Sequence, residues 1–450
     1  MNNTENLLEK HEDDMWRCAH CSLCKYPPLM NVRSARFAQV CCSIDYGLFH
    51  AFSGGGKLNI AHSFLEGRIN KISDELRDVI FQCSLCGACD VSCKYSTNIE
   101  LLKGIFDLRR YIVEKFGPQP VHTRFADLSE KFNNPYGEEH EKRQSWIDET
   151  SVNLDSDSST LFYTGCTSAY RQQDMVKASV EILKLIGVDF NVSKDEYCCG
   201  SPIFRSGLVN RAKKFFKYNI ELFDNLGINK VITACPGCYS MFLAQYPAFL
   251  EDKTLEKWKK IDFLHMTEVI AEAIRKKKLK FKDLKDKPII TYHDPCHLGR
   301  GAEPYVPKWE GTKRKVFNQI TIYEPPKTYR RGGKGVYDAP RRIFKKMKKN
   351  IGFFEMFRIA EYAYCCGSGA GVKAAYPDMA ISAASERLQE AEYVLNKAES
   401  SDPDINANNQ KLLISACPFC KTNFEDAIEK TDKDIKYMDI NQFVLERIEK

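Results

Sequence analysis

The residues of this chain that could do chemistry are its nineteen cysteines, ten of which form two sets with the same internal order. In each set a single cysteine comes first, a Cys-Cys-Gly triplet follows, and a Cys-Pro-x-Cys motif ends the set. The first set is Cys166, Cys198, Cys199, Cys235 and Cys238, and the second is Cys296, Cys365, Cys366, Cys417 and Cys420. Thiolates bind soft transition metals, and five thiolates are more than one tetrahedral zinc ion can use.

Two shorter runs of cysteines lie near the N-terminus. The first is Cys18, Cys21 and Cys24, and the second, Cys83, Cys86, Cys89 and Cys93, has the CxxCxxCxxxC spacing of ferredoxin-type loops. In such loops three close thiolates bind one [4Fe-4S] cubane, and the fourth thiolate binds the other cubane. We therefore expect Cys18, Cys21, Cys24 and Cys93 to hold one cubane. Cys83, Cys86 and Cys89 would hold the second and need one more ligand.

That ligand must be Cys41 or Cys42. In ferredoxin-like subunits a proline usually follows this position, and Cys42 stands where the proline would be, so the motif favours Cys41. Cys42 is then the one cysteine without an assignment. Its simplest interpretation is a small buried apolar residue.

The composition is that of a soluble globular protein with two or three domains, since 43% of the 450 residues are apolar and 28% are charged. We find no apolar run of eighteen residues, and the first seventeen residues are acidic, unlike an export leader. We expect a cytoplasmic protein without a membrane span. CxxC spacing in a large chain favours metal ligation over disulfides, and a net charge of +6 does not indicate nucleic acid binding.

Each cysteine group of the first set follows a predicted strand. We expect strands at 161–164, 188–192 and 230–234, alternating with helices at 176–186 and 211–226. Alternating strands and helices form parallel sheets, which bind ligands beyond the carboxyl ends of their strands. The same order of motifs and elements recurs after residue 288, with helices at 335–347 and 380–395, which indicates a tandem repeat.

The fold class we expect is therefore α/β, with a helical ferredoxin-type [4Fe-4S] domain followed by two tandem α/β CCG modules with parallel sheets. The predicted ranges are the ferredoxin-type domain at 1–120, a linker at 121–158, and modules at 159–287 and 288–450, the second with insertions near 301–334 and 399–411. Within the first domain we expect a helical segment at 33–78, broken by three glycines at 54–56, and a helix at 99–115.

Three other features are candidates for function. The segment from Lys308 to Lys349 holds fourteen Lys or Arg and three acidic residues, so it either docks an acidic partner or anionic substrate or is a solvated insertion. His293 and His297 flank Cys296 and are weak candidates for proton donation, with a structural role favoured for both. Gly367, Gly369 and Gly371 would let backbone N–H groups approach metal-bound sulfur.

Two ferredoxin-type motifs followed by two CCG modules resemble the D-type subunit of heterodisulfide reductase over almost the whole chain. The stretches 294–300, 335–341 and 365–378 carry the same resemblance. It implies that each five-cysteine set ligates a noncubane [4Fe-4S] cluster, in addition to the two cubanes, and that a disulfide is cleaved between the two noncubane clusters. Iron-sulfur subunits of lactate and glycolate oxidation systems and of class II benzoyl-CoA reductase complexes share these modules, so the fold does not fix the substrate.

Three hypotheses follow. The first is an oxidoreductase that passes electrons from the cubanes to the noncubane clusters and reduces a small disulfide. The second is an electron-relay subunit without its own substrate, and the third is a zinc-bound scaffold. Elemental analysis would distinguish the third, because four [4Fe-4S] clusters require about sixteen irons per chain. Because no flavin or nicotinamide fingerprint is visible, we expect a redox partner: a membrane cytochrome, an electron-transfer flavoprotein, or a hydrogenase or flavin subunit. We expect the chain and its partner to form a hetero-oligomeric complex, in which only the partner would contact the membrane.

Overall fold

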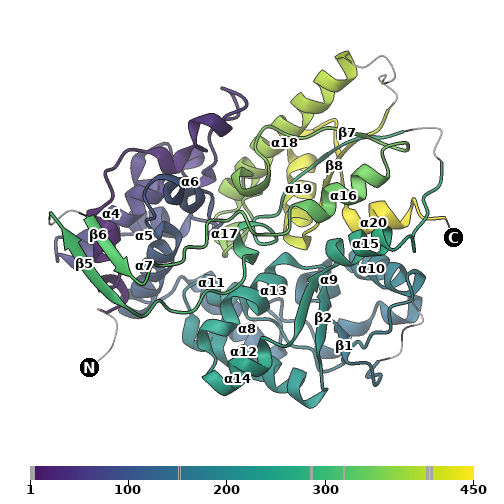
Figure 1. The fold of residues 1–450 in the computed structure, drawn as a ribbon, viewed down its shortest axis with the longest axis horizontal. Helices are drawn as coiled ribbons and strands as arrows, with labels where there is room; N and C mark the ends of the chain where they lie inside the picture. Colours follow the sequence, from purple (N-terminus) through teal and green to yellow (C-terminus); the bar gives the residue numbers. More distant parts are fainter. Residues whose placement is uncertain are drawn as a thin grey trace.

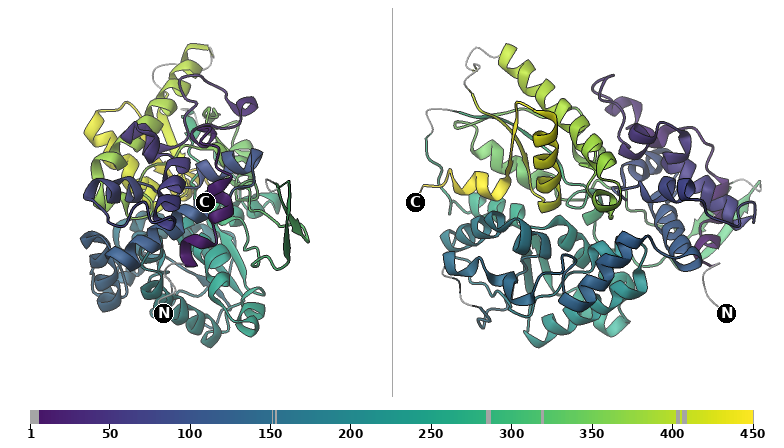
Figure 2. Two further views of the ribbon diagram at one scale, coloured as in Figure 1. Left: turned by 90° about the vertical axis from the view of Figure 1, so that its left-hand side faces the viewer. Right: turned by 180° about the vertical axis from the view of Figure 1, so that it is seen from behind.

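A computed structural model describes residues 6–150, 152, 154–283, 287–317, 320–401, 405 and 409–449. It consists of an N-terminal group of helices and two α/β modules, which lie side by side in Figure 1 and in the right view of Figure 2. Part of the predicted insertion at 399–411 lies outside the described residues. Within them, no helix is long and apolar enough to cross a lipid bilayer.

The N-terminal group is helical throughout. Its helices are α1 (Asn6–Glu9), α2 (Glu12–Trp16), α3 (Cys42–Gly47), α4 (Gly54–Leu65), α5 (Asp74–Phe81), α6 (Ala88–Ser96) and α7 (Leu101–Phe116), with short 3-10 turns η1 (Leu23–Lys25), η2 (Leu29–Asn31) and η3 (His50–Phe52). Helices α4 and α7 form the centre, where Leu58, Ile105 and Leu108 are fully buried. The amphipathic spacing in α7 places these apolar residues on one face.

The three glycines at 54–56 begin helix α4, so the prediction that they break a helix is wrong. The Ser53 hydroxyl accepts a hydrogen bond from the Gly56 amide at 3.0 Å and caps the helix. A Cβ at Gly56 would lie 2.1 Å from the His50 carbonyl oxygen, and a Cβ at Gly55 would lie 3.5 Å from the Cys18 sulfur. The Gly55 distance is an ordinary contact, whereas a Cβ at Gly54 would lie 3.1 Å from the Cys89 sulfur. Close approach to a backbone carbonyl at Gly56 and to a thiol at Gly54, and not a turn, is what favours glycine here.

The described part of the stretch predicted as a linker, 121–158, is largely helical up to residue 149. It contains α8 (Pro120–Phe132) and two 3-10 helices, η4 (His140–Gln144) and η5 (Ile147–Glu149). Trp146 is fully buried, and the buried Arg143 pairs with Glu196 of the first module. The polar composition that indicated a linker therefore includes charges that are neutralised by distant partners.

The first module has a parallel sheet in the order β1 (Thr160–Phe162), β2 (Lys230–Thr233), β3 (Asp262–His265). Its register pairs Leu161 with Val231 and Val231 with Phe263. The strand predicted at 188–192 is reduced to a single bridge at Asn191, which lies at the edge of the sheet beside β1. The helices are α9 (Cys166–Arg171), α10 (Gln173–Leu185), α11 (Ser201–Arg205), α12 (Val209–Asn225), α13 (Pro236–Ser240), α14 (Asp252–Trp258) and α15 (Met266–Arg275), with η6 (Met241–Gln245) and η7 (Tyr246–Phe249) after α13.

The second module repeats this sheet with one more strand. The order is β7 (Gly352–Phe353), β4 (Ile289–Tyr292), β8 (Lys411–Ser415), β9 (Lys436–Asp439), and all pairs are parallel. Strands β4, β8 and β9 correspond to β1, β2 and β3, which confirms the α/β class with parallel sheets. The helices are α16 (Asp338–Lys346), α17 (Val372–Ala375), α18 (Pro377–Ser401), α19 (Pro418–Thr431) and α20 (Ile440–Leu445), with η8 (Arg300–Ala302) and η9 (Ala360–Tyr362).

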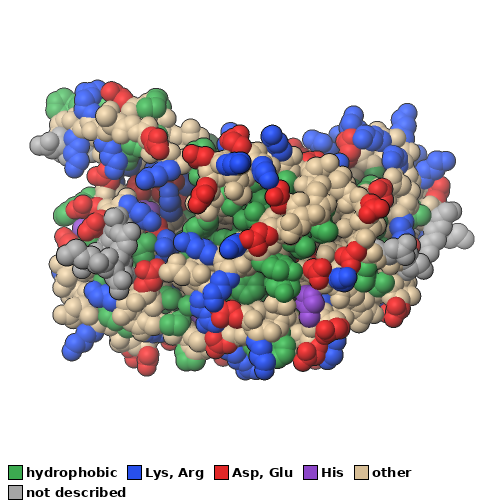
Figure 3. Space-filling model, turned by 90° about the horizontal axis from the view of Figure 1, so that it is seen from below, with side chains coloured by type: hydrophobic (Ala, Val, Ile, Leu, Met, Phe, Trp, Pro, Cys, Tyr) green, Lys and Arg blue, Asp and Glu red, His purple; other side chains and the backbone are tan. Residues whose placement is uncertain are grey.

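The predicted insertion at 301–334 forms an antiparallel hairpin of β5 (Thr312–Val316) and β6 (Ile320–Glu324). The hairpin projects from the body at the left of Figure 1, and Figure 3 shows Lys and Arg side chains along this arm. It reaches the N-terminal helices, where Lys313 pairs with Asp13 at 3.0 Å and Lys327 pairs with Glu100 at 2.8 Å. Part of the basic segment is thus used to hold the domains together.

Candidate metal centres

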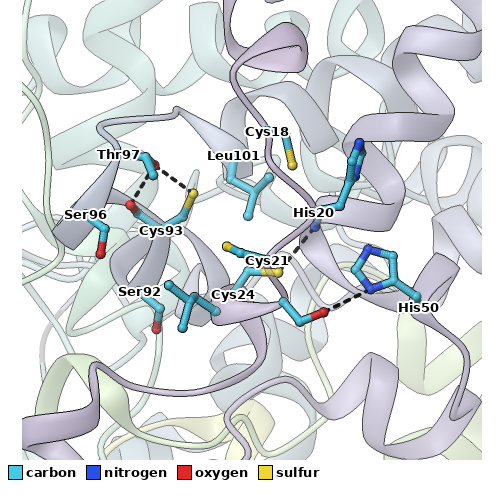
Figure 4. A pocket seen from close by; sticks show the side chains of 13 residues that line it. Cys18, His20, Cys21, Cys24, His50, Ser92, Cys93, Ser96, Thr97 and Leu101 are labelled. Atoms are coloured by element: carbon cyan, nitrogen blue, oxygen red, sulfur yellow. Dashed lines mark hydrogen bonds between the residues drawn. The ribbon is translucent and has the colours of Figure 1, made fainter.

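The first cysteine run and Cys93 line one cavity. Figure 4 shows the sulfur atoms of Cys18, Cys21, Cys24 and Cys93 turned toward a common space. Helix α6 supplies Cys93, and η1 with the preceding turn supplies the other three. The Gly55 amide donates a hydrogen bond to the Cys24 sulfur at 3.4 Å, so a backbone donor already faces a thiol of this group.

The other five N-terminal thiols form two groups, one around Cys41 and one at Cys365 of the second module. Cys89 and Cys83 lie near Cys41, and burial raises the pKa of the Cys41 thiol to about 11. Cys86 and Cys42 instead contact Cys365 of the second module, and hydrogen bonds with Cys365 raise the pKa of both thiols. The structure thus groups Cys41 with Cys83 and Cys89 but puts Cys86, a predicted ligand of the same cubane, with Cys42 at Cys365. The choice between Cys41 and Cys42, and iron binding by all of these residues, stay predictions.

The first five-cysteine set is brought together completely. Hydrogen bonds join Cys166 to Cys198, Cys198 to Cys199, Cys199 to Cys238, and Cys238 to Cys235. All five side chains are buried, and the bonds from Cys198 and Cys238 lower the pKa of the Cys199 thiol to about 6. The loops that carry them leave the same edge of the sheet, after β1, Asn191 and β2.

A buried charge network supports this first set. Arg143 donates a hydrogen bond to the Cys166 sulfur at 3.2 Å and pairs with Glu196 at 2.5 Å. Glu196 in turn accepts hydrogen bonds from the amides of Thr164 and Gly165, both at 2.8 Å. Sequence reasoning missed Arg143, because it stands in a polar stretch with no motif, and its partners are distant in the chain.

The second set is also brought together. Cys296 and Cys366 form hydrogen bonds with Cys365, whereas Cys420 contacts both Cys366, at 3.4 Å between the sulfurs, and Cys417. These bonds from Cys296 and Cys366, together with those from Cys42 and Cys86, hold the pKa of the Cys365 thiol well below its usual value.

The Cys-Cys-Gly triplets of the two modules have the same local geometry. The Gly200 amide donates to the Cys198 sulfur at 3.3 Å, and the Gly367 amide donates to the Cys365 sulfur at 3.3 Å. Both glycines have positive φ, which a residue with a Cβ rarely adopts. In the predicted glycine trio, Gly369 has a different role, because its Cβ would lie 2.9 Å from the Ser84 carbonyl oxygen of the cubane loop.

Ser84 links the cubane loop to the second set. It lies between Cys83 and Cys86, and its hydroxyl donates a hydrogen bond to the Cys365 sulfur at 3.3 Å. The Cys42 sulfur lies 3.6 Å from the same hydroxyl. Ser84 and Cys42 are both buried, so this contact between the N-terminal domain and the second module is shielded from water.

His293 lies against the second set. One of its ring nitrogens and the sulfurs of Cys366 and Cys420 all lie within 4.8 Å of one another. Burial and then the charge of Arg387 hold the pKa of His293 well below its usual value, and Arg387 donates to its Nδ1 at 3.2 Å. A neutral ring that accepts at Nδ1 carries its hydrogen on Nε2. In the structure Nε2 is buried and makes no hydrogen bond with the described residues.

Arg205 lies between the two five-cysteine sets. Burial lowers the pKa of this arginine to about 10, while Cys296 of one set and Cys199 of the other both favour its charge. Its guanidinium is held by the hydroxyls of Ser240, at 2.9 Å, and Ser201, at 3.2 Å. His297 is close by, and burial followed by the charge of Arg205 holds its pKa well below the usual value.

The donor sets fit iron-sulfur clusters. None of the nineteen cysteines, all of which are described, is in a disulfide. Backbone amides donate to sulfur in three of the groups, and a Cβ at Gly165 would lie 3.1 Å from the Cys238 sulfur, so glycine keeps that space open. Thiolates in polar cradles of backbone N–H groups are the usual ligands of these clusters.

Comparisons with known proteins agree with this arrangement. The cysteine-rich domain named CCG matches residues 160–243 and 321–425, which include every cysteine of the two sets except Cys296. The D-type subunit of the dihydromethanophenazine:CoB–CoM heterodisulfide reductase of Methanosarcina acetivorans is 31% identical over 82% of this chain and 77% of its own length. Its counterpart in Methanosarcina mazei is 29% identical over 83% and 79%.

A further relative has a different name. The B-type subunit of the fumarate reductase (CoM/CoB) of Methanothermobacter marburgensis is 28% identical over 80% of this chain and 60% of its own length. The resemblance to the heterodisulfide reductase subunit is the stronger of the two in identity and in the share of both chains that it covers. This chain is an iron-sulfur oxidoreductase that belongs to the family of D-type heterodisulfide reductase subunits.

Proposed function

We propose that the chain receives electrons at two cubane [4Fe-4S] clusters, passes them to two noncubane [4Fe-4S] clusters, and reduces a small disulfide between the latter. The cubane ligands would be Cys18, Cys21, Cys24 and Cys93 for one cluster, and Cys41, Cys83, Cys86 and Cys89 for the other. The two five-cysteine sets would ligate the noncubane clusters. The observation that carries the proposal is the position of Arg205, a buried cation beside thiols of both sets.

Bound clusters would supply single electrons, and a pair of them could supply the two electrons that, together with two protons from solvent, convert one disulfide into two thiols. The chain's own residues would hold the substrate. Arg205 and Arg300 are buried cations, and Arg300 lies near both Cys86 and Cys296. A disulfide with carboxylate, phosphate or sulfonate groups would be attracted to these two guanidinium groups.

The route of the electrons follows from one contact. Ser84 belongs to the loop of the second cubane and donates to Cys365, so the second module is the one that this loop touches directly. Electrons would therefore reach the second set first and the first set afterwards. The proposed redox partner is a membrane cytochrome, an electron-transfer flavoprotein, or a hydrogenase or flavin subunit in a hetero-oligomeric complex.

A second candidate function is electron relay without a substrate. The burial of all five thiols of the first set favours it, because buried clusters carry electrons without contact with solvent. The EtfAB:quinone oxidoreductase of Syntrophomonas wolfei, 25% identical over 83% of this chain and 47% of its own length, has a name that fits this function.

An anaerobic assay distinguishes these functions. Purified protein would be reduced with dithionite-reduced methyl viologen, and viologen oxidation would be followed after addition of anionic mixed disulfides. Turnover that is lost in Arg205→Met, with iron content unchanged, supports the disulfide reductase. Clusters that are reduced without any turnover support the relay, and a colourless protein that contains zinc and no iron contradicts both.

A further inference from the structure

The surface around the first cysteine run carries large apolar side chains that contact little else. Leu29 is 84% exposed, Leu48 80%, Met30 78%, Phe49 76% and Leu23 43%. They come from η1, η2 and the turn between α3 and η3. We call these five residues the apolar rim. Soluble proteins rarely gather so many exposed apolar side chains without an interaction that uses them.

Contacts with the cavity show that the apolar rim belongs to the same surface as the thiols. Leu23 lines the cavity directly, beside Cys21. Tyr95, at the end of the helix that carries Cys93, donates a hydrogen bond to the Met30 sulfur at 3.2 Å. His50, which follows Phe49, lies 3.4 Å from the Ser22 hydroxyl and also lines the cavity, as Figure 4 shows.

One thiol of this group reaches solvent. Cys21 is exposed, whereas Cys24 of the same run is buried. The neighbouring Ala19 and His20 are exposed or partly exposed as well. Electron transfer between proteins becomes faster as the two centres approach, so a ligand at the surface marks where a second protein would have to bind. The other N-terminal thiols are buried or half-buried.

The segment that carries the first cysteine run and three of the five rim residues is basic. Between Trp16 and Ile44 the sequence has four Lys or Arg residues and no Asp or Glu. Two of the four are neutralised, since Arg17 pairs with Asp14 and Arg36 pairs with Glu386. Within the described residues, Lys25 and Arg33 have no carboxylate at ion-pair distance, and both are at least partly exposed. Asp45, which stands in α3 before Leu48, is half-buried and accepts hydrogen bonds from Gln39 and Tyr364. The apolar rim is therefore accompanied by uncompensated positive charge.

We propose that the apolar rim, with Lys25 and Arg33, is the docking surface for an electron-carrying protein whose contact face is apolar at its centre and acidic at its edge. This inference rests on the proposed function, because it assumes that Cys18, Cys21, Cys24 and Cys93 hold a redox cluster. Transient protein interfaces commonly have Leu, Met and aromatic side chains at the centre and charged side chains around them. Opposite charges at the edge would speed the encounter.

The experiment measures how fast two donors reduce the protein in a stopped-flow instrument. The protein donor is a reduced acidic [2Fe-2S] ferredoxin, used as a probe of the proposed partner chemistry, and the small donor is reduced methyl viologen. The variants are Leu29→Glu and the double change Lys25→Glu with Arg33→Glu. Leu185→Glu, at a leucine on the first module that is 42% exposed, is the matched control.

We expect Leu29→Glu to lower the second-order rate constant for reduction by ferredoxin about ten-fold or more, since it places a charge in the apolar rim. The double variant is expected to lower it by a similar factor and to remove most of its dependence on ionic strength. Iron content and the rate with methyl viologen should stay at wild-type values in both, and Leu185→Glu should match the wild type throughout.

Three results would overturn the docking surface while leaving the proposed function intact. The first is equal ferredoxin rates in Leu29→Glu and Leu185→Glu, and the second is a wild-type ferredoxin rate that does not depend on salt. The third is binding to phosphatidylglycerol vesicles that Leu29→Glu abolishes without changing the ferredoxin rate, because the rim would then contact lipid. A protein without iron, or one that methyl viologen cannot reduce, would overturn the proposed function and this inference together.

Discussion

The two five-cysteine sets share the same motif order but have different surroundings. The first set receives a hydrogen bond from a charged donor, Arg143, which Glu196 neutralises. The second receives one from a neutral donor, Ser84, and lies against His293. The first set is thus supported from the stretch before its own module, whereas the second is joined to the N-terminal domain. The two sets share their motif order, but contacts from outside the repeat, together with His293 inside the second module, make their surroundings unequal.

The strongest test of this comparison removes one ligand from each set. Cys199→Ser and Cys366→Ser change equivalent positions, and each is expected to remove about four of about sixteen irons, because each set would hold its own cluster. Iron and sulfide analysis of the anaerobically purified variants measures this. Loss of about eight irons in either variant would show that the two sets depend on each other and would contradict two separate centres.

The charged support of the first set can be broken directly. Arg143→Met leaves Glu196 buried without its cation, which we expect to destabilise the fold by about 3–5 kcal/mol. The melting temperature, measured by calorimetry, should fall accordingly. In the double variant with Glu196→Gln the stability should recover part of the loss, since no unpaired charge remains and the amide oxygen can still accept from the Thr164 or Gly165 amide. A single variant as stable as the wild type would mean that water reaches Glu196.

The Ser84 hydroxyl, the neutral donor to the second set, is expected to raise the reduction potential of the second noncubane cluster. Ser84→Ala removes one hydrogen bond of about 1 kcal/mol to the Cys365 sulfur, which lowers the reduction potential of the second noncubane cluster by about 40 mV for one electron. A redox titration followed by electron paramagnetic resonance measures the shift. Ser84→Thr keeps the hydroxyl and serves as the control. An equal shift in both clusters, or a shift in the first alone, would contradict the assignment of Ser84 to the second set.

The smallest expected effect concerns pH. His265 and Asp439 occupy equivalent helix N-caps after β3 and β9, and both are buried. Burial lowers the pKa of His265 to about 4 and raises the pKa of Asp439 to about 7. Because the unfolded histidine takes up a proton more readily, the first module should lose stability as pH falls from about 6.5 to 4. The second should lose stability as pH rises from about 4 to 7, since the folded aspartate holds its proton longer.

Melting temperatures at several pH values check this for His265→Asn and Asp439→Asn, which keep a capping side chain. Each variant should remove the pH dependence of its own module, worth a few kcal/mol at most. If Asp439→Asn leaves the decline between pH 4 and 7 unchanged, another group is responsible for it.

Thiol spacing predicted which cysteines of each five-cysteine set lie together, because the spacing is local and it repeats, whereas ligation of clusters by these thiols stays a prediction. Cys166 to Cys238 and Cys296 to Cys420 each predicted one group, and the parallel strands that carry them bring the thiols to one edge of each sheet. The crossed arrangement of the N-terminal thiols was also predictable, since Cys93 lies with Cys18 and not with its nearer neighbours.

Contacts between distant residues could not be predicted in this way. Arg143 stands in a polar stretch that indicated a linker, and only the folded position of Glu196 shows that its charge is buried. The glycines at 54–56 were interpreted as a break because propensity is local, whereas the Ser53 cap begins a helix there and the His50 carbonyl oxygen leaves no space for a Cβ at Gly56. Likewise, nothing near Ser84 in the sequence indicated that its hydroxyl faces Cys365.

The hairpin of β5 and β6 has a further consequence. Its segment anchors the N-terminal helices to the second module, because Lys327 pairs with Glu100 and Lys94 donates a hydrogen bond to the Arg330 carbonyl. Burial opposes the charge of Glu100, but the surrounding lysines outweigh it and lower the pKa of this residue to about 2. Many redox proteins carry electrons on a domain that swings between donor and acceptor. These contacts would prevent such a domain movement, so the chain would transfer electrons as one rigid body. A mobile electron carrier would then have to be a separate molecule.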